Sequence, residues 1–122
     1  MDTAGIQDTV AVEVGLGQAR ALARDYADRV RGHFGPRLRR VRLYGSAARG
    51  DWTAESDIDV LVLLDRVSEA DSDWLVRQAV SLGLMQHGVL LQPLFMPEQD
   101  FNHLRERERL FALEVEREGI DL

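Results

Sequence analysis

The chain has 122 residues, of which 45% are hydrophobic and 30% are charged, and its formal net charge is −6. This composition is typical of a folded, soluble protein and excludes a disordered chain, while the negative charge argues against broad nucleic-acid binding. The sequence has no cysteine, which excludes disulfides and thiolate metal sites. Since no apolar run could span a membrane and no signal-peptide pattern opens the chain, we expect residues 1–122 to form one cytoplasmic domain.

The first long helix is expected after a mixed amino-terminal segment. Ile6, Val10 and Val14 are four residues apart and indicate a short helix or arm, which two glycines then interrupt. Apolar residues next recur in steps of three and four, as on one face of an amphipathic helix, until Gly35-Pro36 ends it. They are Leu16, Ala19, Ala23, Tyr26, Ala27, Val30 and Phe34. The opposite face is expected to be solvated and carries Arg20, Arg24, Asp25, Asp28 and Arg31.

A basic cluster brackets the first expected strand. It consists of Arg37, Arg39, Arg40 and Arg42. These side chains could face the phosphates of a ligand or lie on a solvent-facing strand edge, and the sequence favours the edge.

The most informative stretch joins two expected strands. Val41–Tyr44 reads as a strand that ends in a glycine turn, and Val60–Leu64 is an apolar run typical of a strand buried on both faces. The turn from Asp51 to Glu55 links them, so we expect antiparallel pairing. Trp52 in this turn could stack on a nucleobase, but a packing role is favoured.

Two carboxylates mark the start of the second strand. Residues two apart in a strand point to the same side, so Asp57 and Asp59 are expected to face one way, with alpha carbons roughly 6–7 Å apart. Such a pair can bind a hard cation such as Mg²⁺, which takes oxygen ligands. In the alternative reading, Asp57 ends a strand and Asp59 pairs with an arginine.

The loop before these acids has the features of a phosphate site. Gly45 allows positive φ and close approach of the backbone to a ligand, and Ser46 adds a hydroxyl. The N–H groups of residues 45–48 could form an anion-binding concavity, and Arg49 carries a planar guanidinium that suits phosphate oxygens. A plain surface turn is the alternative for this loop when it is taken alone.

The remainder of the chain predicts two more helices and one more strand. Ser68 is expected to cap a helix that ends near His87-Gly88, and Val89–Met96 reads as a strand in which Pro93 requires an edge or a bulge. A last helix is expected to start at Pro97 and to run unbroken to Gly119. Its buried side is expected to contain Phe101, Leu104, Phe111 and Val115.

The spacing of Gly45-Ser46, ten residues, and then Asp57-Ile58-Asp59 resembles the signature of the DNA-polymerase-beta-like nucleotidyltransferase superfamily. The small size is similar to that of minimal nucleotidyltransferases, the MNT half of HEPN–MNT toxin–antitoxin pairs, and the similarity extends over nearly the whole chain. The resemblance implies an α/β (α+β) fold with a mixed sheet of three or slightly more strands flanked by helices. It also implies ATP as substrate, Mg²⁺ as cofactor, and transfer of AMP to a hydroxyl.

The resemblance assigns roles to individual residues. Gly45 and Ser46 would hold the triphosphate, Asp57 and Asp59 would bind metal and act in catalysis with Ser46, and Arg49 would contact the nucleotide. The acceptor would be a tyrosine of a partner HEPN toxin, which AMPylation silences.

One departure from the family pattern concerns a third carboxylate, which the superfamily usually takes from a later strand. The matching strand here has no acid, and Gln92 stands near that position. Two alternatives therefore stay open. One is an antitoxin with weak or no activity that neutralises the HEPN toxin by binding alone, and the other is a small-molecule nucleotidyltransferase of the aminoglycoside kind.

Overall fold

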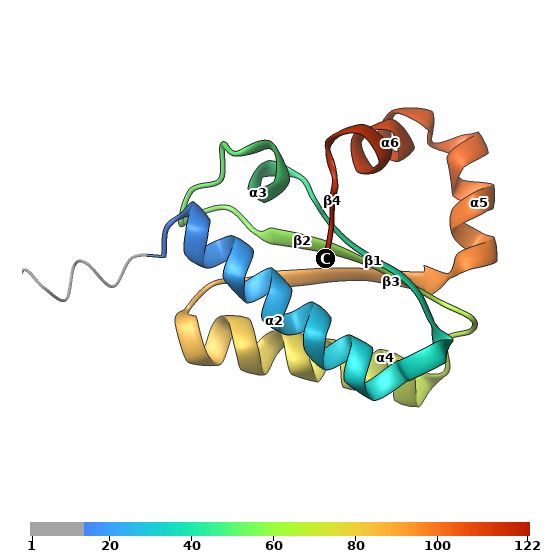
Figure 1. Cartoon of the computed structure of the whole chain (residues 1–122), viewed down its shortest axis with the longest axis horizontal. Helices are drawn as coiled ribbons and strands as arrows, with labels where there is room; N and C mark the ends of the chain where they lie inside the picture. Colours follow the sequence, from blue (N-terminus) through green and yellow to red (C-terminus); the bar gives the residue numbers. More distant parts are fainter. Residues whose placement is uncertain (1–13) are drawn as a thin grey trace, which may run out of the picture.

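The computed structural model describes residues 14–122 (Figure 1). The expected arm at Ile6 and Val10 lies outside the described residues. The elements, in chain order, are α2 (Leu16–Phe34), η1 (Gly35–Arg37), β1 (Leu38–Tyr44), α3 (Ser46–Arg49), β2 (Ile58–Leu64), α4 (Glu69–Ala79), η2 (Val80–Met85), β3 (Leu91–Pro97), α5 (Glu98–Arg107), α6 (Arg109–Leu113), η3 (Glu114–Glu118) and β4 (Ile120–Asp121).

The strands form one mixed sheet with the order β3-β2-β1-β4. β1 pairs antiparallel with β2 and β4, whereas β2 and β3 are parallel. This four-stranded sheet flanked by helices confirms the predicted fold class and the predicted antiparallel pairing of the two central strands. β3 is an edge strand, which explains why Pro93, without a backbone N–H, is tolerated there.

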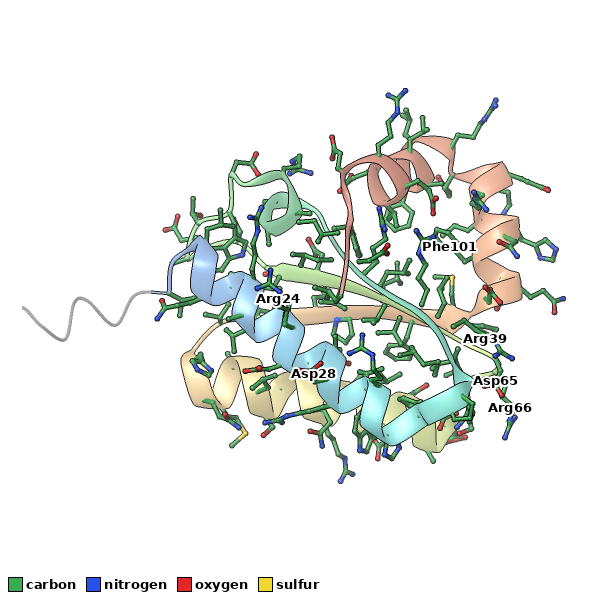
Figure 2. All side chains as sticks on the ribbon, in the orientation of Figure 1. Arg24, Asp28, Arg39, Asp65, Arg66 and Phe101 are labelled. Carbon is green, nitrogen blue, oxygen red and sulfur yellow. The ribbon has the colours of Figure 1, made fainter. Side chains whose placement is uncertain are left out.

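Helices cover both faces of the sheet, so β2 is buried on both sides as predicted. Ile58 and Val60 pack in the larger core with residues of α2 and α4, and Leu61 and Leu63 pack on the other face. Phe101 of α5 points toward that second face, where Val115 of η3 is also fully buried (Figure 2). Within residues 14–122, no helix is long and apolar enough to cross a membrane.

The carboxyl-terminal helix is broken, so the prediction of one continuous helix was wrong. Glu108, with φ −116 and ψ 67, separates α5 from α6. The break lets Phe101, on α5, and Val115, after α6, reach the same core from different directions. The chain then enters β4, a strand that the sequence did not reveal.

Arg42 ties this segment to the sheet, and its predicted place on a solvent-facing edge was wrong. Arg42 is 8% exposed, and its side chain donates to the carbonyl oxygens of Val115 (2.7 Å) and Gly119 (2.9 Å). It also pairs with Asp121 on β4, which covers this edge, and Arg40 pairs with Asp121 at 3.6 Å. A Cβ at Gly119 would lie 2.5 Å from the Arg42 Nε, so the hydrogen bonds of Arg42 to this segment require glycine there.

A second arginine joins the end of β2 to α4. Arg37 pairs with Asp65, just after β2, at 3.0 Å, and with Asp71 of α4 at 2.7 Å. Ser68 caps α4 as predicted, because its hydroxyl accepts from the Asp71 N–H while its own N–H donates to the Asp71 carboxylate. Asp65, labelled in Figure 2, lies at the opposite end of the sheet from α3, labelled in Figure 1.

Candidate functional site

The residues singled out in the sequence meet where β1 ends and β2 begins. Tyr44, the last residue of β1, pairs with Asp59 of β2. Because side chains alternate along a strand, Asp59 faces the same side as Leu61, which is the side covered by the carboxyl-terminal helices. The site therefore lies at one end of the sheet, beside α3 and the segment from Phe111 to Glu118.

Gly45 lies directly against the carboxylate of Asp59. Its φ of 76° is in the region that favours glycine, and a Cβ added here would lie 2.5 Å from Asp59 Oδ2. The predicted bend and the predicted acid are thus in contact. Any larger residue at this position would have to displace either the turn or the carboxylate.

The loop continues into α3, a single turn of helix. The N–H groups of Ala48 and Arg49 both donate to the Gly45 carbonyl oxygen, at 3.1 and 3.0 Å. The N–H groups of Ser46 and Ala47 come before this first intrahelical bond and are therefore not used within the helix. Two backbone donors and the Ser46 hydroxyl follow the bend at Gly45, as an anion site requires.

Arg20 holds α3 in place from α2, although the sequence placed it on a solvated helix face. Its guanidinium donates to the carbonyl oxygens of Ala47 (2.8 Å) and Ala48 (3.0 Å). These bonds satisfy acceptors at the end of α3 that the short helix leaves without intrahelical partners. The prediction was wrong for this one residue because nothing local distinguishes it from its neighbours on α2.

Asp57 and Asp59 share one environment. Burial, the charge of Asp57 and the charge of Glu114 together raise the pKa of Asp59 to about 6, while Arg49 opposes this shift. Trp52 fixes the entry to β2 by donating from Nε1 to the Asp57 carbonyl oxygen at 3.1 Å. Its side chain is 6% exposed, which confirms the predicted packing role.

Arg49 lies at the rim of the site and is surrounded by acids. It pairs with Glu114 at 3.4 Å, Glu118 at 3.5 Å and Asp51 at 3.6 Å. Desolvation disfavours its charged form, but these three carboxylates outweigh that effect and raise the pKa of Arg49. The predicted phosphate ligand is therefore a cation that already has carboxylate partners within the chain.

Tyr44, Phe111 and Glu114 also belong to this region, and sequence reasoning did not find them as site residues. The rings of Tyr44 and Phe111 are 5.5 Å apart and perpendicular. Burial first, and then the charges of Asp59 and Glu114, raise the pKa of Tyr44 to about 12. The only sequence signal was the spacing of Phe111 and Glu114, which places them on one side of a helix.

Gln92 lies beside the carboxylate pair, as the sequence suggested. It pairs with Asp59 in the register of β2 and β3 and is exposed. Among residues 14–122, no three acidic or histidine side chains are arranged to hold a metal ion. The predicted donors, Asp57 and Asp59, are a set that would suit Mg²⁺, since this ion is commonly bound by one or two carboxylates together with substrate phosphates and water.

Comparison with known proteins identifies the family. Residues 24–118 match the Nucleotidyltransferase domain family. A protein of Methanocaldococcus jannaschii named as a candidate protein adenylyltransferase, MJ0604, is 32% identical over 79 residues, which are 65% of this chain and 74% of the relative.

Two solved toxin–antitoxin structures share the fold. One, with AMP-PNP, has a TM-score of 0.54 at 19% identity and covers 80% of this chain and 69% of the neighbour. The other, a tyrosine-to-alanine mutant of MntA-HpeT, has a TM-score of 0.53 at 21% identity and covers 81% of this chain and 70% of the neighbour. The chain therefore belongs to the nucleotidyltransferase domain family, as the glycine-serine bend and the two aspartates predicted, and is a nucleotide-transferring enzyme.

Proposed function

We propose that this enzyme transfers AMP from ATP to a protein hydroxyl, a tyrosine of a HEPN-type toxin, and that Mg²⁺ is its cofactor. The closeness of Gly45 to the Asp59 carboxylate carries this proposal, since the bend that we propose to bind phosphate lies beside an acid that we propose to bind metal. The name of the M. jannaschii relative supports protein adenylylation, and the toxin–antitoxin structures support a toxin partner. Because ATP is an intracellular metabolite, the reaction would take place in the cytoplasm.

The chain's residues would divide the work as follows. Ser46, with the N–H groups that begin α3, would bind the β- and γ-phosphates, and Arg49 would stabilise the charge of the leaving pyrophosphate. Asp57 and Asp59 would hold Mg²⁺, which would supply positive charge to offset the phosphate oxygens and to counter the burial and the neighbouring charges that raise the pKa of Asp59.

Transfer forms a bond between the acceptor oxygen and the α-phosphorus and breaks the bond to pyrophosphate, so it depends mainly on positioning and electrostatics. The proton of the acceptor hydroxyl needs a base. Gln92 is a neutral amide beside Asp59 and cannot accept it. We therefore assign the removal of this proton to a group of the toxin or of the ATP substrate.

The test is transfer of label to a HEPN-type toxin, with the protein encoded next to this chain as the first candidate. ATP labelled at the α-phosphate should label the toxin, and ATP labelled at the γ-phosphate should not. Asp57→Asn should abolish the transfer, whereas Asp73→Asn, on an exposed part of α4, should leave it unchanged. Labelling that survives Asp57→Asn at the wild-type rate would defeat this assignment.

Gln92 also supports a second candidate, an antitoxin that neutralises its toxin by binding alone. A site that has lost its third carboxylate and keeps only two acids would be expected in a protein that descends from an active enzyme and no longer needs the reaction. An Asp57→Asn/Asp59→Asn double variant separates the candidates. It protects cells from the toxin if binding suffices and fails to protect them if transfer is needed.

A further inference from the structure

The carboxylates around Arg49 have no part in the proposed transfer, and they come mostly from one segment. Glu114 and Glu118 belong to η3, and Asp51 belongs to the turn after α3. Each lies within 3.6 Å of the Arg49 guanidinium. Arg49 is also the residue proposed to bind the phosphates of the nucleotide. The same guanidinium would therefore bind either the carboxylates of the chain or the phosphates of the ligand.

The position of η3 is fixed by contacts that do not involve Arg49. Val115 is fully buried, and its carbonyl oxygen accepts from Arg42. One turn earlier, Phe111 packs against Tyr44. These contacts keep Glu114 and Glu118, one turn apart, on the side of η3 that meets Arg49.

The ion pairs themselves are open to exchange. The Arg49 side chain is 38% exposed, and Glu114 and Glu118 are 35% and 45% exposed. Beside them is a surface hollow of about 400 Å³ lined by Arg49, Leu110, Leu113, Glu114, Arg117 and Glu118. Ion pairs between exposed side chains contribute little to stability, so a polyphosphate, which has many charged oxygens, can displace the glutamates from Arg49.

We propose that Glu114 and Glu118 are positioning residues that bind the Arg49 guanidinium when no nucleotide is present. A nucleoside triphosphate would then bind by displacing the two glutamates from Arg49. The inference rests on the proposed function, since it requires phosphate at Arg49. It assigns the carboxyl-terminal segment a role in nucleotide binding. The two glutamates keep the guanidinium extended toward the site and weaken the binding of every ligand that must compete for it.

Calorimetric titration of the full chain with AMP-PNP and Mg²⁺ tests this exchange. Glu114→Gln/Glu118→Gln keeps the shape of both side chains and should tighten binding by about three- to tenfold, because two competing charges are removed. Glu106→Gln/Glu108→Gln is the matched control. It makes the same change in net charge on α5 and at the helix break, away from Arg49, and should alter the affinity by less than about twofold.

A double-mutant cycle isolates the role of Arg49. In an Arg49→Gln background, removal of the two glutamates should change the affinity by less than about twofold, since there is no guanidinium left to compete for. Equal tightening with and without Arg49 would overturn the inference, because the glutamates would then act by direct repulsion of the phosphates. Melting curves confirm that each variant is folded, and Glu118→Gln alone, at the more exposed residue, should show the same sign with a smaller change.

The outcomes also separate this inference from the proposed function. If the wild-type chain binds the analogue and the double variant binds it no tighter, the exchange at Arg49 is wrong and the nucleotide site stands. If no variant binds the analogue, the nucleotide site itself is wrong, and the exchange at Arg49 is wrong with it. Binding only after both glutamates are removed would support the inference most strongly.

Discussion

β2 has a group of carboxylates at each end, and the two groups are built in opposite ways. At the end of β2, Asp65 and Asp71 share Arg37, which holds the pKa of Asp71 well below its usual range although burial opposes the shift. At the start of β2, Asp57 and Asp59 are close together, and the pKa of Asp59 is raised to about 6 by burial and by the charges of Asp57 and Glu114.

The two groups differ in whether the chain itself balances the charges of the carboxylates. The Arg37 group (Arg37, Asp65 and Asp71) satisfies its charges within the chain and so stabilises the fold. The carboxylate pair, Asp57 and Asp59, contains a charge that the folded chain disfavours and that a divalent cation would favour. Substitutions at the two ends should therefore have opposite effects on stability and on transfer.

The largest effect is expected from Asp59→Asn, which should reduce AMP transfer by about a thousandfold, because the proposed metal site would lose one of its two charged ligands. Asp71→Asn, the same change in the Arg37 group, should leave transfer per folded molecule unchanged. The measurement is the initial rate of labelling from α-labelled ATP. A similar loss in both variants would erase the distinction between the two groups.

Gly45→Ala should reduce transfer by about a hundredfold, because the new methyl group would collide with Asp59 Oδ2 and move one partner of the site. Gly88→Ala is the matched control. Gly88 also has positive φ, at 67°, but a Cβ there would meet no atom within 4 Å. Both variants should lose some stability, but transfer should fall only in the first, as labelling rates at equal folded concentration would show.

The Arg37 group predicts a change in stability. Asp71→Asn should lower the free energy of unfolding by about 1–2 kcal/mol at pH 7, because it weakens the bonds to Arg37 and to the Ser68 N–H. Since the folded-state pKa of Asp71 is lowered, its contribution is fully present above about pH 4 and declines progressively as the pH falls from that value toward the lowered pKa. Urea unfolding from pH 3 to pH 7 measures both effects. Asp73→Asn should show neither, and equal losses in the two variants would contradict the assignment.

The smallest effect is a gain in stability at the opposite end of β2. Asp59 titrates near pH 6 in the folded chain and near pH 4 when unfolded, so the native state binds more protons in this window and the wild type loses stability as the pH rises through it. Asp59→Asn does not ionise and should be more stable than the wild type by about 1 kcal/mol above pH 6. The difference should vanish near pH 4. Urea unfolding at pH 4 and pH 8, without metal, measures this difference. A variant less stable than the wild type at pH 8 would contradict the prediction.

The local structure around the candidate site could be predicted because it depends on neighbouring residues. Gly45 signals a bend, alternation places Asp57 and Asp59 on one side of a strand, and the uninterrupted apolar run at Val60–Leu64 identifies a strand buried on both faces. Each of these signals is contained in a few neighbouring residues. The fold class followed from the same stretch through its family resemblance.

The parts that were missed depend on contacts between distant residues. Arg42 meets Val115 across 73 positions, and nothing in the run of arginines marks it as the buried one. The helix breaks at Glu108 although residues 98–118 contain no glycine or proline, because Phe101 before the break and Val115 after it pack into the same core from different directions. Glu114 reaches the site only through that break.

The most direct test of the central claim is thermal unfolding with and without Mg²⁺ and AMP-PNP. The carboxylate pair should make the wild-type chain respond to the magnesium–nucleotide complex with a clear rise in Tm, because the bound cation relieves the repulsion at Asp59. Asp59→Asn should start from a higher Tm without ligand at pH 8 and should gain almost nothing on addition of the complex. An equal rise in both proteins would contradict the account, since the nucleotide would then bind without the two aspartates.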